Sequence, residues 1–127
     1  MKTQICTSIE QSKRLIDLGI DVYTADCWHH LDILSNEYIL WTLPFNHDLI
    51  DGHPEDVFGW SLHNLLSFLP ETIQYNGETH FLKFNTKNVC YYESVKGVVL
   101  ETHKGNNLYD NIINALEFLL DNNILKW

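Results

Sequence analysis

The sequence predicts an α+β fold in which three helices pack mainly on one face of an antiparallel sheet. Apolar residues recur at helical spacing near both ends of the chain and after Ser61, but from about residue 73 they alternate with polar residues in short runs. A regular alternation of strands and helices, which is typical of a parallel sheet, is missing. We therefore expect a meander of three to four strands, with residues 37–43 as a candidate additional strand, in a single domain over residues 1–127.

The first helix is expected to end at Gly19, because glycine readily adopts the left-handed conformation that ends many helices. Thr7 and Ser8 are its candidate N-caps. Each is followed three residues later by a side chain that can complete a capping box, Glu10 or Gln11. The apolar stripe of this helix comprises Ile9, Leu15, Ile16 and Leu18.

The next part of the chain is less regular. Residues 27–34 are compatible with either a short helix or a strand. Residues 37–43 are expected to form a strand, because the strand-forming run Tyr38–Trp41 comes shortly before Pro44. A turn-rich stretch over residues 44–59 follows, and loops of this length are often functional.

Two more helices are expected in the second half of the chain. The first is capped by Ser61 and ends before Pro70, and its buried face comprises leucines. The second is long, covers about residues 108–122 and has Asn106 or Asn107 as its N-cap.

The meander is predicted between these two helices. Asn76-Gly77 is the strongest hairpin signal in the sequence, because a type I′ turn needs positive φ at both central residues. Neither face of the predicted sheet is clearly polar, which indicates that a protein partner or a second copy covers part of it. The predicted strands cover residues 73–75, 79–84, 88–94 and 97–103.

The composition indicates a folded chain, since 45% of its 127 residues are hydrophobic despite a net charge of −9. Its apolar runs are far shorter than a membrane span, and we expect no secretory leader. Cys6, Cys27 and Cys90 form no C-x-x-C pair and fit free thiols in a reducing compartment. We therefore expect a cytoplasmic protein with no cofactor and no membrane association.

The charge distribution excludes one class of partner. Lysine and arginine are absent between Arg14 and Lys83, whereas carboxylates are frequent there, and every histidine except His103 lies in that stretch. A surface that binds a phosphate backbone needs several fixed positive charges, so we expect no binding to nucleic acid. An acidic surface instead attracts a basic protein partner.

Several segments carry a resemblance to a known family. They are residues 8–19 with Thr24-Ala25-Asp26 after them, residues 60–70, and residues 107–120. These segments resemble a family of short uncharacterised proteins from mobile elements and phages of gut bacteria. That family has no assigned activity, so the resemblance implies no catalytic residues. It implies that the chain is an accessory or inhibitory factor of a mobile element or phage.

Cys27, His29, His30 and Asp32 form the most reactive-looking group in the sequence. On a helix, Cys27 and His30 would be neighbours, and a cysteine nucleophile needs a histidine to form its thiolate. Imidazole and carboxylate groups can also bind zinc or iron, but their spacing here matches no standard metal motif. A small hydrolase or metalloenzyme using these residues is the alternative function, while we expect a buried cysteine beside surface or hydrogen-bonded histidines, with no metal.

The turn-rich stretch supplies the candidate partner-binding residues, which combine apolar, acidic and histidine side chains: Phe45, His47, Asp48, Asp51 and His53. The alternative is a solvated loop whose apolar residues pack on the core. The sequence as a whole predicts a non-enzymatic, acidic protein-interaction module, with a basic protein or a second copy as its partner.

Overall fold

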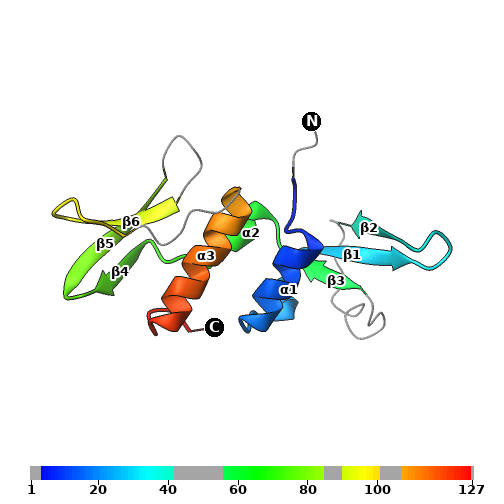
Figure 1. Cartoon of the computed structure of the whole chain (residues 1–127), viewed down its shortest axis with the longest axis horizontal. Coiled ribbons are helices and arrows are strands. Elements are labelled where there is room, and N and C mark those ends of the chain that lie inside the picture. The colour runs from blue at the N-terminus through cyan, green and yellow to red at the C-terminus, as the bar shows by residue number, and fades with distance from the viewer. Residues whose placement is uncertain (1–3, 42–55, 85–89, 101–106, 127) are drawn as a thin grey trace. The chain divides into compact units, whose positions relative to one another are not determined.

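The computed structural model describes residues 4–41, 56–84, 90–100 and 107–126, and it confirms the α+β class. Within these ranges it contains three α-helices and two antiparallel sheets (Figure 1). The elements divide between two compact units, residues 1–64 and residues 65–127, and each unit is described by itself. The single domain expected over residues 1–127 stays a prediction.

The first unit combines one α-helix with a three-stranded sheet. Its elements are α1 (Ile9–Asp17), the 3-10 turn η1 (Val22–Thr24), β1 (Cys27–Asp32), β2 (Glu37–Trp41) and β3 (Val57–Gly59). Strand β1 lies in the middle, in the order β2-β1-β3, and both neighbours run antiparallel to it. The register places Trp28 of β1 opposite Trp41 in β2 and Phe58 in β3.

Both ends of α1 follow the signals in the sequence. Ser8 is the N-cap, since its hydroxyl accepts a hydrogen bond from the N–H of Gln11 (3.1 Å) and its own N–H donates to the Gln11 side chain (2.9 Å). Beyond the helix, Gly19 has φ +94°, and its N–H donates to the carbonyl of Ile16. The capping box and the left-handed glycine are therefore confirmed.

Strand pairing in the first unit departs from the sequence expectations in two places. The strand expected over residues 37–43 exists as β2, but it pairs with β1 and is not an additional strand of the meander. Strand β3 lies at the end of the stretch 44–59, for which the sequence predicts turns and no strand. Its run Val57–Gly59 is too short to stand out in the sequence and becomes a strand through its pairing with β1.

Helix α2 (Leu62–Leu66) spans the boundary between the two units. Ser61 caps it as expected, because its hydroxyl accepts a hydrogen bond from the N–H of Asn64 (3.3 Å). The helix is shorter than the leucine pattern predicted. After it, the N–H groups of Phe68 and Leu69 donate to carbonyls three residues earlier, which tightens the chain into turns before Pro70.

The second unit contains the predicted meander. Its strands are β4 (Thr72–Tyr75), β5 (Glu78–Phe84), β6 (Cys90–Ser94) and β7 (Val99–Leu100). They pair antiparallel in the order β4-β5-β6-β7. Asn76 and Gly77 connect β4 to β5 with φ of +52° and +77°, as a type I′ turn requires, so the predicted hairpin is confirmed.

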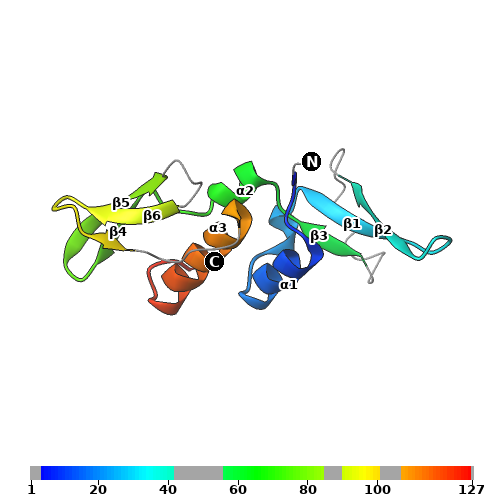
Figure 2. The same cartoon turned by 45° about the horizontal axis from the view of Figure 1, so that its top comes forward.

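Helix α3 (Leu108–Asp121) packs on one face of the meander and lies beside it in Figure 2. Asn107 caps it by accepting a hydrogen bond from the N–H of Asp110 (2.9 Å). Among the described helices, none combines the length and apolar character needed to cross a membrane. The buried residues of these elements include Ile112, Ile113, Leu116 and Leu119 on α3 and Ile73, His80 and Tyr92 on the strands.

Candidate functional site

The loop residues that the sequence indicated for partner binding are not part of the structure described. Phe45, His47, Asp48, Asp51 and His53 lie outside the described residues. Their role in binding stays a prediction, and the candidate site comes from the described residues of the first unit.

The reactive-looking group from the sequence lies on strand β1 rather than on a helix. Successive side chains of a strand point to opposite faces, so Cys27 and His29 lie on one face while His30 and Asp32 lie on the other. Cys27 and His30 are therefore not neighbours, and the cysteine–histidine pair of the hydrolase alternative does not form. Within the described ranges, no three histidine, cysteine or carboxylate side chains are placed to hold a metal ion.

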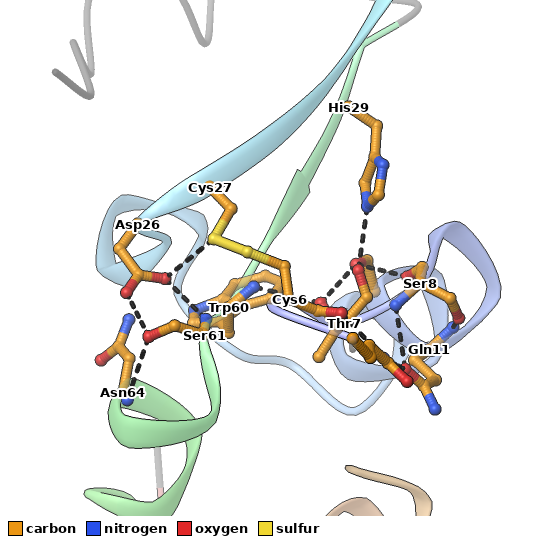
Figure 3. The surroundings of a disulfide bond; sticks show 12 residues. Cys6, Thr7, Ser8, Gln11, Asp26, Cys27, His29, Trp60, Ser61 and Asn64 are labelled. Carbon is orange, nitrogen blue, oxygen red and sulfur yellow. Dashed lines mark hydrogen bonds between the residues drawn. A yellow bond between two sulfur atoms is a disulfide. The ribbon is translucent and has the colours of Figure 1, made fainter. Parts of the chain in front are cut away.

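Cys27 instead forms a disulfide with Cys6, which precedes α1 (Figure 3). The two Cα atoms are 6.7 Å apart, and the residues are separated by 21 positions in the sequence. The expectation of free thiols is wrong for this pair, and Cys90 is the free cysteine of the described chain. Because the thiol argument for a reducing compartment no longer applies, the cytoplasmic location stays a prediction.

Thr7, next to this disulfide, joins three segments of the first unit (Figure 3). Its N–H donates to the carbonyl of Trp60 (2.9 Å), and the N–H of Trp60 donates to its hydroxyl oxygen (3.0 Å). The same hydroxyl shares a hydrogen bond with Ser12 Oγ (2.7 Å), and the carbonyl of Thr7 lies 2.9 Å from His29 Nε2. Every polar group of this buried threonine is thereby satisfied, and His29 has a structural partner.

Asp26 lies on the other side of the disulfide (Figure 3). One carboxylate oxygen accepts the backbone N–H of Ser61 (2.8 Å), and the other accepts the Ser61 hydroxyl (2.5 Å). Its Oδ1 also lies 3.6 Å from Cys27 Sγ. A disulfide sulfur has no proton, so this is a contact in the oxidised protein, whereas a reduced Cys27 thiol could donate a weak hydrogen bond there. Asp26 therefore links the start of β1 to the cap of α2.

His30 pairs with a buried carboxylate. Its Nδ1 lies 3.0 Å from Asp56 Oδ2, and the Asp56 side chain is only 1% exposed while that of His30 is 31% exposed. Asp56 also accepts the N–H of Leu31 (3.0 Å). A buried carboxylate costs free energy unless hydrogen bonds compensate its lost hydration, and these donors supply that compensation. The geometry gives His30 a structural role next to β3.

The outer strand β2 exposes large apolar side chains from its second residue to its last. Tyr38, Ile39, Leu40 and Trp41 are 44%, 45%, 37% and 46% exposed. Isolated exposed apolar residues are common on proteins, but a contiguous stretch is typical of an interaction site. We name this region the β2 surface and define it as Ile33 and Leu34 of the preceding turn together with Glu37–Trp41.

One end of the β2 surface is acidic. Asp32 and Glu37 lie directly opposite each other in the register of β1 and β2. Asp32 accepts hydrogen bonds from the N–H of Leu34 (3.2 Å) and the hydroxyl of Ser35 (2.9 Å), which stabilise the turn. Like charges opposite each other repel, so a cation beside this pair would be favourable.

The free thiol of the second unit is not a candidate nucleophile. The N–H of Cys90 donates to Asn111 Oδ1 (2.5 Å), and burial raises the pKa of its thiol to about 11. Burial, with a smaller contribution from a charged Cys90, also raises the pKa of Tyr92, whose hydroxyl donates to the carbonyl of Pro70 (2.8 Å). A thiol that stays protonated at neutral pH reacts slowly, so Cys90 acts as a packing residue.

A shallow depression lies beside the Asn76-Gly77 turn. Its volume is about 190 Å³, and it is lined in part by Glu78, Ser94 and Lys96. Ligand pockets are usually larger, about 300 to 1,000 Å³. The depression does not provide the deep, convergent pocket that would favour an enzyme.

We compared the chain with protein-family models, curated proteins and solved structures. No protein-family model, curated protein or solved structure matches the chain. The β2 surface is therefore the candidate site because of its exposure, its position at the edge of a sheet and its acidic end.

Proposed function

We propose that the chain is a non-enzymatic protein-interaction module and that a protein partner binds at the β2 surface. The observation that supports this proposal is the exposure of Tyr38–Trp41 on both faces of an outer strand. Covering apolar surface releases about 25 cal/mol per Å², so a partner that buries these side chains gains binding free energy from each of them.

Two further features agree with a binding module. The disulfide removes Cys27 as a nucleophile, and the hydrogen bonds of His29 and His30 hold these side chains in structural roles. The net charge of −9 favours a basic partner over an acidic one. An accessory or inhibitory factor of a mobile element or phage, as the resemblance implies, would act in this way on a basic protein.

A paired comparison of double variants tests the proposal. Ile39→Thr with Leu40→Thr removes one apolar side chain from each face of β2, while threonine keeps the β propensity of the strand. Val98→Thr with Val99→Thr is the matched control, because these adjacent residues of the second unit are similarly exposed, at 52% and 47%. Thermal melting of both variants checks that the fold is retained.

Each protein is immobilised and exposed to extract of its native host, and the captured proteins are identified by mass spectrometry. We expect proteins captured by the wild type and by the control variant to be lost from the β2 variant. Identical sets from all three proteins would contradict the assignment of the β2 surface as the binding site.

A further inference from the structure

We infer that Asp26 protects the Cys6–Cys27 disulfide from reduction by thiols, because it places a negative charge beside one of the two sulfur atoms. This inference concerns the chemistry of the bridge and is independent of the proposed binding function. Asp26 Oδ1 lies 3.6 Å from Cys27 Sγ, at the start of β1 (Figure 3). A charge at this distance opposes any reaction step that places negative charge on that sulfur.

Hydrogen bonds hold the Asp26 carboxylate beside the bridge. Its Oδ1 accepts the backbone N–H of Ser61 (2.8 Å), and its Oδ2 accepts the Ser61 hydroxyl (2.5 Å). The N–H of Asp26 donates to the carbonyl of Gly59 (3.2 Å), which also fixes the backbone at this position. The carboxylate therefore cannot turn away from Cys27 Sγ without losing charge-assisted hydrogen bonds.

Reduction that begins at Cys6 leaves a negative charge on Cys27. When the thiolate of a reductant attacks Cys6 Sγ, a new S–S bond forms there, the bond to Cys27 breaks, and its electron pair leaves on Cys27 Sγ. Asp26 repels the charge that develops on this leaving sulfur, so the step is slow. A second thiolate then attacks the reductant's sulfur in the mixed disulfide and releases Cys6. Two reductant thiols thereby become a disulfide, and the two cysteines take up their protons.

Reduction that begins at Cys27 meets the same charge. Attack at Cys27 Sγ expels Cys6 as the thiolate, but it brings the thiolate of the reductant toward Asp26. Cys6 and Cys27 are also buried, at 4% and 2% exposure, which limits the access of every reagent. The expected consequence is a bridge that, once formed, persists in the presence of small thiols.

Thiols of different charge test this inference on the oxidised full chain. Mercaptoethanesulfonate, mercaptoethanol and cysteamine carry a negative, a neutral and a positive group besides the thiolate, and each is used at the same thiolate concentration. Reduced Cys6 and Cys27 are alkylated and quantified by mass spectrometry. The measurement is made at pH 8, where the imidazole of His29, on the same face of β1 as Cys27, is ordinarily neutral. We expect cysteamine to reduce the wild type fastest and the sulfonate slowest.

Three single variants separate the charge of Asp26 from its other roles. Asp26→Asn removes the charge but keeps hydrogen-bonding groups, and it should speed reduction by the sulfonate about tenfold and reduction by cysteamine less than about threefold. Asp17→Asn makes the same change in net charge at the far end of α1 and should leave the rates nearly unchanged. Ser61→Ala removes a hydrogen bond to Asp26 but keeps its charge, so any loosening should speed all three reagents by the same factor.

Two results would overturn the inference. One is that Asp26→Asn leaves the rates unchanged or raises them by one factor for all three reagents. The other is that Asp17→Asn changes the selectivity among reagents as much as Asp26→Asn does, because net charge would then explain it. Thermal melting checks that each variant folds. If Asp26→Asn does not fold, the reduced wild type gives a second test: iodoacetamide should alkylate Cys27 several times more slowly than Cys6, and equal rates would overturn the inference.

Discussion

Trp28 and Trp41 stack across β1 and β2, with ring centroids 5.6 Å apart and an angle of 11° between the ring planes. Trp28 is buried at 7% exposure, whereas Trp41 is 46% exposed. The stack therefore connects the core of the first unit directly to the β2 surface. It also explains why an exposed tryptophan has a defined position: the buried ring provides a flat support for it.

Replacing Trp41 with alanine should destabilise the protein through loss of this stack. We expect the free energy of unfolding to fall by about 1 kcal/mol, the usual size of an aromatic pair, in addition to the loss of partly buried apolar area. Urea denaturation followed by circular dichroism measures the change. Phe81→Ala is the control, because Phe81 is 40% exposed on a strand of the second unit. If Phe81→Ala lowers the free energy of unfolding as much as Trp41→Ala does, the stack has no specific role.

The disulfide should be detectable and should stabilise the chain. Mass spectrometry of the unreduced protein, alkylated after unfolding, should find Cys90 modified and Cys6 linked to Cys27. Cys6→Ser with Cys27→Ser should lower the free energy of unfolding by about 3 kcal/mol, as expected for a loop of this size. Cys90→Ser serves as the control for loss of a cysteine outside the bridge, and alkylation of all three cysteines without a reductant would show that the bridge is absent.

Stability should decrease at alkaline pH because of Cys90. Its pKa is raised from 9.0 to about 11 in the folded protein, so between these values the unfolded chain loses a proton that the folded chain keeps. The stabilisation is complete below pH 9 and is lost as the pH rises toward 11. The pKa of Tyr92 is also raised in the folded protein, so its deprotonation lowers the stability further at higher pH.

Melting temperatures measured from pH 8 to pH 11 test whether stability decreases as the pH rises. The wild type should lose stability over the interval, and Cys90→Ala should show a shallower decrease, since it removes one of the two groups. In addition, Cys90 should react slowly with a thiol reagent at pH 8 in the folded protein and rapidly after unfolding. Equal pH slopes for the two proteins would contradict the role of this thiol.

Gly77→Val should strain the central hairpin. Gly77 has φ +77°, and a Cβ added there would meet no heavy atom within 4 Å, so the cost comes from the backbone rather than from a clash. A β-branched residue at this φ should cost about 1 to 3 kcal/mol of unfolding free energy. Gly77→Asn should cost less, because asparagine tolerates positive φ better, and an unchanged melting temperature in Gly77→Val would count against the turn.

Sequence alone determined the features that depend on residues a few positions apart. The capping box of Ser8 with Gln11, the left-handed Gly19 just after α1 and the turn at Asn76-Gly77 all appear where the pattern predicted them. Each depends on local φ and ψ and on hydrogen bonds between near neighbours, so the residue types suffice to predict it. The meander and the long C-terminal helix were predicted for the same reason, since their apolar periodicity is local.

Only the tertiary structure decided which distant segments meet. Cys6 and Cys27 are 21 positions apart, and His30 and Asp56 are 26 positions apart. No spacing rule predicts such pairs, because they depend on how α1, β1 and β3 pack together. The same holds for β2, whose apolar run predicted a strand but could not show that pairing with β1 would leave it as an exposed outer strand. Exposure is a property of the packed chain, and the candidate binding surface could be found only there.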